Sequence, residues 1–463
     1  MQKISFVSSK KLTDINFKLL NMLYFCLPIS FLVGNGFTNA IIFLIFIIGV
    51  FSFPRKLYLV KNDSIMFIIL AFFITLLIST LLDIQENPNN DNFFKSISYF
   101  RYFFLFLFTS FFVKIEKFNF KYFIISCLTC TFLLSLDISF QFLSGFNVLG
   151  FKAYEFSSIH LAGFIKEKFI AGGYIQKFYI FGLILFPFIS KKLEKQKFVL
   201  SIFLTVIFFT GIFYSGNRMP LLMFLFSIFL IILLIKNLRF PMIISILLCS
   251  VIFFTTMKNN NKLYEHYLSF YSNAIYMQAK GKAFPVIDYL KEYTFKKYPE
   301  LEKKEKKHFP SEFSKDKSLS KYKIIHFASG HAVVYITAID LWTDSPIIGS
   351  GIKSFRIKCL SKLYLPNRVC QAHPHNFYLE LLNDTGLIGT VLFLFAIFFL
   401  LKNKFLNFKN FEKKEKLLIL CIFIIIASEF FPMRSSGSFF STRDSSYIFF
   451  ILGMLHGLKK VKI

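Results

Sequence analysis

Long apolar segments separated by shorter polar stretches recur along this chain. Each segment is roughly 16 to 20 residues long, which is the length that a helix needs to cross the hydrocarbon of a bilayer. The segments lie near residues 17–33, 38–53, 64–82, 97–113, 121–145, 171–190, 198–214, 219–235, 241–257, 386–401, 417–432 and 445–457. The pattern therefore predicts an all-α polytopic membrane protein with about 12 transmembrane helices.

The same pattern divides the chain into three parts. Residues 1–257 contain the first nine predicted helices, and residues 386–463 contain the last three. Residues 258–385 form the one substantial extramembrane segment, within which residues 293–323 are dense in Lys and Glu and nearly lack aliphatic side chains. We interpret residues 293–323 as a solvated, Lys-rich insert, because such a composition cannot build an apolar core.

The net charge is large and positive, and its distribution predicts the topology. The chain has 463 residues, 55% of them hydrophobic, and a formal charge of +28. In a soluble protein this charge would suggest nucleic acid as a partner. Here Lys and Arg concentrate in the short loops on one side of the predicted membrane, so the positive-inside rule places both termini in the cytoplasm and residues 258–385 outside. We therefore expect membrane lipids, and no nucleic acid, as partners.

A polar stretch leads into the tenth predicted helix and contains His373, Pro374, His375 and Asn376. Pro374 suits the first turn of a helix and Gly386 suits its end, so we predict a short amphipathic helix between them. Histidine is the side chain best able to exchange protons near neutral pH. Two imidazoles at the membrane surface are therefore candidates for proton transfer, and the alternative is that both are exposed loop histidines.

Further cationic side chains fall on the same external face. Arg218 lies in a very short turn, where its planar fork of donors suits phosphate oxygens, although a lipid-anchoring role is the alternative. Arg434 and Arg443 flank a serine-rich turn and weaken the positive-inside bias, so we expect one of them to contact an anionic ligand. With His331 they predict transfer from a lipid pyrophosphate. No residues have the spacing of metal ligands, so we expect no metal or other cofactor.

Charged residues within the predicted helices are few. Lys177, near the start of the sixth, is expected to extend its ammonium to the membrane surface, and the alternative is that it lines a cavity. Arg101 either faces an interior or pairs locally.

The cysteines suggest one disulfide. Five of the seven cysteines fall in predicted helices, where they act as small apolar residues. Cys359 and Cys370 share the external segment. In an oxidising periplasm, a disulfide between them would close a short loop and brace the chain before His373.

At these residues the chain resembles the O-antigen ligase family and the related O-antigen polymerases. The family's marker is His-Asn, then nine residues, then Gly-x-x-Gly followed by Thr or Val. His375-Asn376 and Gly386-Leu-Ile-Gly389-Thr390 match this marker in full. The stretch 341–355 and the turn that ends at Arg218 also resemble segments of the family.

The resemblance implies a GT-C-like, inverting and metal-independent glycosyltransferase of the bacterial inner membrane, active at the periplasmic face. Its donor would be an undecaprenyl-pyrophosphate-linked glycan. A ligase would use a lipid A–core hydroxyl as acceptor, and a polymerase would use a second lipid-linked glycan. A lipid-linked oligosaccharide transporter is a further alternative, which would need mid-membrane charges and related halves.

Carried over to this sequence, the resemblance makes His375 the candidate catalytic residue and Arg218 a pyrophosphate contact. His331 stands where the family often has Arg, so either His331 contacts phosphate more weakly or Arg434 or Arg443 supplies the missing charge. The expected substrate-binding residues are Arg218, His331, His373, Asn376, Arg434 and Arg443.

Overall fold

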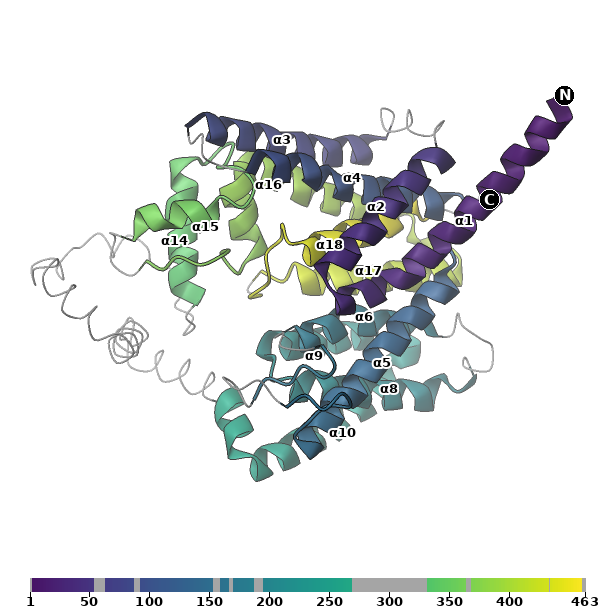
Figure 1. Cartoon of the computed structure of the whole chain (residues 1–463). Coiled ribbons are helices and arrows are strands. Elements are labelled where there is room, and N and C mark those ends of the chain that lie inside the picture. Colours follow the sequence, from purple (N-terminus) through teal and green to yellow (C-terminus); the bar gives the residue numbers. More distant parts are fainter. Residues whose placement is uncertain are drawn as a thin grey trace, which may run out of the picture.

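The protein folds into a bundle of helices, which we describe from a computed structural model (Figure 1). The structure describes residues 2–53, 63–86, 92–152, 159–165, 170–186, 195–268, 331–363, 368–432 and 434–459. The predicted Lys-rich insert, residues 293–323, lies outside these ranges.

Fourteen α-helices account for most of the described chain. Nine precede the extramembrane segment: α1 (Gln2–Val33), α2 (Asn35–Ser52), α3 (Ser64–Glu86), α4 (Asn92–Lys114), α5 (Phe120–Ser144), α6 (Ala171–Leu185), α8 (Lys197–Tyr214), α9 (Arg218–Leu234) and α10 (Arg239–Asn259). They are followed by α14 (His331–Asp344), α15 (Phe355–Lys358), α16 (Phe377–Leu406), α17 (Lys413–Glu429) and α18 (Thr442–Gly457). Each of the predicted apolar segments overlaps one of these helices. Within the described ranges, 8 helices are long and apolar enough to cross a membrane, which makes this a polytopic membrane protein.

The last helix, α18, lies at the centre of the bundle and packs closely on α4 (Figure 1). A Cβ atom on Gly453 would lie 2.7 Å from the carbonyl oxygen of Phe106, and one on Gly457 would lie 2.6 Å from that of Ser110. Small residues allow such close approach of two helix backbones in a membrane. The approach buries the aromatic side chains of α18, including Phe449, on every side.

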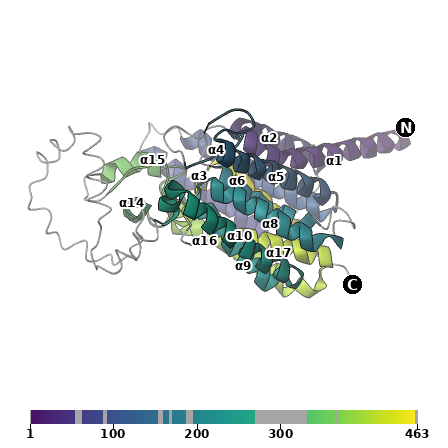
Figure 2. The same ribbon diagram turned by 90° about the horizontal axis from the view of Figure 1, so that it is seen from below.

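The two ends of the bundle carry different parts of the chain. Figure 2 shows both termini at one end, and α14 and α15 at the other. A small second core of Val334, Ala338, Leu341, Phe355 and Cys359 holds α14 and α15 together. Helices α14 and α15 thus form a compact helical layer at the end opposite the termini.

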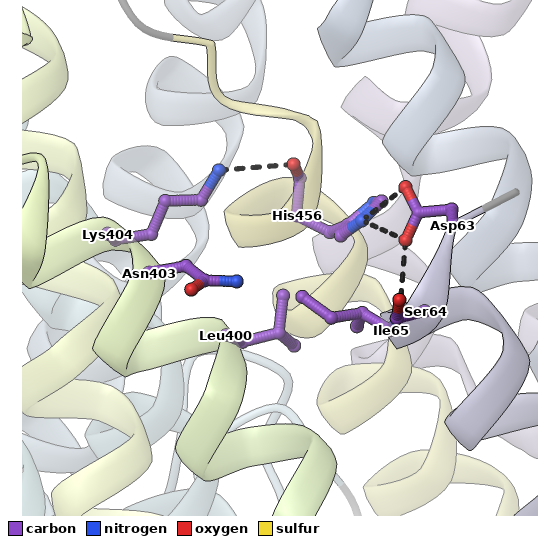
Figure 3. Close-up of a pocket in the computed structure, with 7 residues that line it drawn as sticks. All are labelled: Asp63, Ser64, Ile65, Leu400, Asn403, Lys404 and His456. Atoms are coloured by element: carbon purple, nitrogen blue, oxygen red, sulfur yellow. Dashed lines mark hydrogen bonds and ion pairs between the residues drawn. The ribbon is translucent and has the colours of Figure 1, made fainter.

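A cavity of about 330 Å³ opens at the end that carries the termini. Figure 3 shows its lining residues, which are Asp63, Ser64, Ile65, Leu400, Asn403, Lys404 and His456. His456 Nε2 lies 3.1 Å from Asp63 Oδ2, and Lys404 Nζ donates to the carbonyl oxygen of His456 over 3.2 Å. These contacts tie the start of α3 to the ends of α16 and α18. The cavity lies at the opposite end of α16 from His373 and His375.

Candidate functional site

Three imidazoles meet at the end of the bundle that carries α14. His331 begins α14, whereas His373 and His375 lie directly before α16. The His331 and His375 ring centroids are 4.7 Å apart, and those of His373 and His375 are 4.0 Å apart. The structure thus brings together three of the residues that the sequence singled out. Among the described residues, no group of three or more His, Cys, Asp or Glu side chains could hold a metal ion.

The backbone of His375 adopts an unusual conformation. Its φ is 57°, in the left-handed region that residues other than glycine rarely occupy. The His375 amide donates to His373 Nδ1 over 3.1 Å, and its carbonyl oxygen accepts from the Ser436 amide over 2.9 Å. Such backbone strain persists where surrounding contacts over-determine it, and it is common at functional sites.

Gln371 determines which nitrogen of His375 carries the proton. His375 Nε2 lies 2.6 Å from Gln371 Oε1. An amide oxygen can only accept a hydrogen bond, so Nε2 must carry the hydrogen and Nδ1 is the basic nitrogen of the neutral ring. Burial, and then the charges of His373 and His331, lower the pKa of His375 to about 4. The ring is therefore neutral near physiological pH and can accept a proton.

A serine-rich loop of residues 434–438, here called the serine loop, holds these imidazoles from the other side. Its Ser435 Oγ lies 3.2 Å from His331 Nε2. At its far end, Ser438 Oγ donates to Glu380 Oε1 and the Phe439 amide donates to Glu380 Oε2, both over 2.6 Å. Burial lowers the pKa of His331 and of His373. The serine loop therefore fixes a cluster of neutral rings between α14 and α16.

Asn376 has a structural role in this arrangement. Its Oδ1 caps α16 by accepting from the Tyr378 and Leu379 amides over 3.0 and 3.2 Å, and its Nδ2 donates to the Pro432 carbonyl over 3.0 Å. Asn376 is buried, and both ends of its amide are engaged, so the expected substrate contact gives way to a cap. Because α16 starts after this cap, Pro374 lies before the helix and not in its first turn.

Arg434 points into the protein. Its side chain is buried, with Nη1 2.9 Å from both Ser428 O and Glu429 Oε1, and Nη2 3.1 Å from Gln176 Oε1. The expectation that Arg434 contacts an anionic ligand is therefore corrected. The residue anchors the start of the serine loop to α6 and α17, because a buried guanidinium must be paired.

Lys177 completes this buried network. Its Nζ lies 2.5 Å from Glu429 Oε2 and 3.1 Å from Asp444 Oδ1, and the residue is only 6% exposed. The prediction that Lys177 extends to the membrane surface is wrong. Its two carboxylate partners lie on α17 and α18, and together with Arg434 they give a network of two cations and two anions, whose formal charges cancel.

Arg218 belongs to a second cluster at the same end of the bundle. It begins α9, and its Nη2 lies 3.2 Å from His266 Nδ1. The N-terminal turns of α6 connect the two clusters, because the Gly172 amide donates to Asn217 Oδ1 over 3.1 Å and Gln176, one turn later, bonds Arg434. Arg443 is half-buried in the first turn of α18.

The motif glycines form a break within α16. Gly386 has φ 62° and ψ −165°, which interrupts the helix where the sequence places the end of the short amphipathic helix. A loop of residues 346–351 supplies partners for the backbone groups that the break exposes. The bonds are Leu387 N to Pro346 O (2.9 Å), Ile388 N to Ile347 O (3.1 Å), Ser350 N to Asn383 O (2.7 Å) and Gly351 N to Asp384 O (3.0 Å). A Cβ on Gly389 would lie 2.4 Å from the Thr385 side chain, so both glycines are needed for packing.

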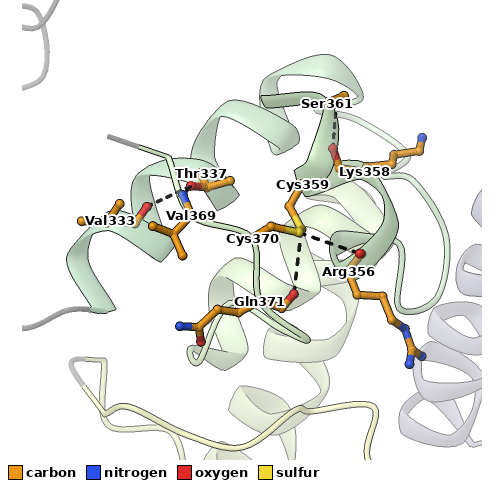
Figure 4. The surroundings of a disulfide bond; sticks show 9 residues. All are labelled: Val333, Thr337, Arg356, Lys358, Cys359, Ser361, Val369, Cys370 and Gln371. Carbon is orange, nitrogen blue, oxygen red and sulfur yellow. Dashed lines mark hydrogen bonds between the residues drawn. A yellow bond between two sulfur atoms is a disulfide. The ribbon is translucent and has the colours of Figure 1, made fainter. Parts of the chain in front are cut away.

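A disulfide joins Cys359 and Cys370 (Figure 4). Cys359 follows α15, and Cys370 directly precedes Gln371. The adjacent Val369 amide donates to Thr337 Oγ1 on α14 over 3.2 Å. The disulfide and the Val369 bond together secure the chain that carries Gln371, the hydrogen-bond partner of His375, to the turn after α15 and to α14.

Sequence reasoning missed four residues of these two clusters. Gln371, Ser435, Glu380 and His266 each hold one of the predicted side chains or the loop that carries it. The spacing of Gln371 four residues before His375 was a weak signal. For the other three, the sequence holds no local indication, because each partner is distant along the chain.

A known family matches the part of the chain that contains these clusters. Residues 203–394 match the family model described as O-Antigen ligase. Among curated proteins, none matches the chain. The matched region runs from α8 to the second half of α16 and contains Arg218, His331 and His375. The comparison therefore shows that this part of a polytopic membrane protein is similar to the O-Antigen ligase family.

Proposed function

We propose that this protein is an O-antigen ligase, which transfers a glycan from undecaprenyl pyrophosphate to a sugar hydroxyl of lipid A–core. The reaction would take place at the periplasmic face of the bacterial inner membrane. The family match supports a ligase or polymerase type of activity on lipid-linked glycans. The observation that carries the proposal is the neutral imidazole of His375, whose Nε2 bonds Gln371 and whose Nδ1 is left as the base.

In this mechanism, His375 Nδ1 accepts the proton of the acceptor hydroxyl. The hydroxyl oxygen attacks the anomeric carbon of the donor sugar from the face opposite the pyrophosphate. A new glycosidic bond forms as the bond to the pyrophosphate oxygen breaks, so the anomeric configuration inverts. General base catalysis of this kind contributes about 10²- to 10⁴-fold to the rate.

The pyrophosphate departs with additional negative charge, which Arg218 would stabilise. Guanidinium donors suit phosphate oxygens, and a fixed cation stabilises charge that develops in the transition state. Arg443, half-buried in the first turn of α18, is the second candidate for this contact. His331 and His373 pack on the His375 ring and exclude water from one side of it.

Complementation of a deletion strain tests the proposal. His375→Ala and Arg218→Ala should abolish long-chain lipopolysaccharide on gels while the protein level stays normal. Arg239→Ala is the matched control, because Arg239 begins α10 and bonds the carbonyl oxygens of Ile232 and Leu233, at the opposite end of α9 from Arg218. Smooth lipopolysaccharide from both site variants would contradict the proposal.

The same strains separate a ligase from a polymerase. Without a ligase, long glycans accumulate on the lipid carrier, because polymerisation continues and transfer does not. Without a polymerase, single repeat units accumulate. We expect long lipid-linked glycans, and single repeats would assign the polymerase activity.

A further inference from the structure

The side chain of Arg218 bonds the imidazole of His266, a residue outside the family's marker. His266 lies in the helical stretch 261–268, at the start of the external segment. Its Nδ1 lies 3.2 Å from Arg218 Nη2, and its Nε2 lies 2.8 Å from the carbonyl oxygen of Gly216. The ring therefore bridges the first residue of α9 and the turn that precedes it.

The bonding partners fix the protonation of His266. The Gly216 carbonyl can only accept, so Nε2 must carry a hydrogen. A guanidinium can only donate, so Nδ1 must be bare. The ring is consequently neutral, in agreement with burial, which lowers the pKa of His266 to about 4. This neutral tautomer is the one in which both ring nitrogens of His266 satisfy their neighbours.

The surroundings of the ring leave it little freedom. The His160 ring packs edge-on against His266, with centroids 5.2 Å apart. Gly216 has φ 69°, and a Cβ atom there would lie 2.6 Å from the carbonyl oxygen of Ile159. The turn before Arg218 thus packs tightly on the segment that carries His160. His266 contacts both, through its bond to Gly216 and its packing on the His160 ring.

We propose that His266 is the positioning residue that aims the Arg218 guanidinium at the pyrophosphate of the lipid-linked donor. The inference rests on the proposed function. A guanidinium has five N–H donors, and the bond to His266 fixes the plane of the fork through one of them. A long side chain otherwise loses conformational entropy when it binds phosphate, so fixing it in advance strengthens binding.

Two substitutions at His266 separate positioning from packing. In His266→Asn, the amide oxygen lies near the place of Nδ1 and can still accept from Arg218. In His266→Leu, both bonds are lost. With purified full-length protein and a titrated lipid-linked donor, we expect His266→Leu to raise the donor KM about tenfold, with a smaller change in kcat. We expect His266→Asn to recover most of this loss.

Binding of undecaprenyl pyrophosphate itself provides the decisive measurement. If His266 acts through Arg218, His266→Leu weakens binding about tenfold in the wild-type background and not at all in an Arg218→Ala background. Equal losses in both backgrounds, or an unchanged Kd in the first, would overturn the inference. Should His266→Leu fail to fold, His266→Gln replaces it, because its amide reaches Gly216 and not Arg218.

The outcomes distinguish this inference from the proposed function. A wild-type protein that transfers no glycan, or an Arg218→Ala variant with normal transfer, defeats the proposed function. An active wild type, an impaired Arg218→Ala and a fully active His266→Leu defeat the role of His266 alone.

Discussion

Gly349 and Gly386 face each other with no space for a side chain between them. A Cβ atom on Gly349 would lie 2.3 Å from the backbone nitrogen of Gly386, and one on Gly386 would lie 2.3 Å from the carbonyl oxygen of Ile347. The loop of residues 346–351 and the break in α16 therefore meet backbone to backbone at these two glycines. This contact explains why position 386 of this chain requires a glycine.

Gly386→Ala should prevent stable folding. Its φ of 62° and ψ of −165° lie in a region that is essentially restricted to glycine, and the added methyl would collide with Ile347. We expect a loss of at least about 3 kcal/mol, seen as a lower melting temperature in detergent and less protein in the membrane. Gly36→Ala is the control, because nothing lies within 4 Å of a Cβ there. A Gly386→Ala protein as stable as this control would contradict this close contact.

The buried charges should differ in their importance. Glu429→Gln leaves Lys177 and Arg434 with a single carboxylate, Asp444, whereas Lys177→Met leaves the pair of Glu429 and Arg434 intact. Removing one partner of a buried pair costs about 3–5 kcal/mol. Melting temperatures should therefore fall further in Glu429→Gln than in Lys177→Met, and the reverse order would show that Lys177 is the principal cation of the network.

The rate of transfer should be insensitive to pH across the neutral range. Because the pKa of His375 is about 4, the base stays neutral down to about pH 5, and kcat/KM should fall about tenfold per pH unit only below pH 4. A fall that begins near pH 6.5, the ordinary value for histidine, would show that the imidazole is not buried during catalysis.

The stability of the folded protein should depend on the protonation of His266 and His375. The pKa values of His266 and His375 are about 4 in the folded protein and about 6.5 in the unfolded chain, so the unfolded chain binds more protons between these values. The free energy of unfolding should be constant above about pH 7 and decrease as the pH falls from about 6.5 towards 4. His266→Asn and His375→Asn, which do not titrate, should each reduce this decrease, as melting curves at pH 5 and pH 7.5 would show.

Loss of the disulfide should weaken both stability and turnover. Cys359 and Cys370 are 11 residues apart, and a loop of about 15 residues gains about 3 kcal/mol from such a bond in the chain-entropy model. Cys359→Ser should lower the melting temperature and reduce kcat, because Gln371 follows Cys370 and bonds the ring of His375, the proposed base. Cys26→Ser, at a free cysteine, is the control. A reductant should reproduce the effect in the wild type and add nothing in Cys359→Ser.

Most of the helical architecture could be predicted from the sequence, because crossing a bilayer demands long apolar runs whatever their partners. The break at Gly386 was also visible, since a glycine at the end of an amphipathic pattern indicates a helix end. The residue at which α16 starts is predicted less accurately from the sequence. Asn376 caps α16, and that cap displaces Pro374 from the helix.

The partners of the charged residues could not be predicted. The bond between Lys177 and Glu429 spans 252 positions of sequence, and that between Arg434 and Gln176 spans 258. Hydropathy gives the depth of a residue along a helix and says nothing of which neighbouring helix it faces. For this reason the sequence predicts a surface position for Lys177 and a ligand contact for Arg434, whereas both are buried partners of Glu429.

The close contact between Gly349 and Gly386 also bears on which parts of the chain can change without loss of the site. It fastens the layer that carries His331 and His375 to the bundle by contacts that lie wholly on the C-terminal side of residue 331. Changes of sequence between residues 268 and 331 should therefore leave this contact, and with it the histidine cluster, in place.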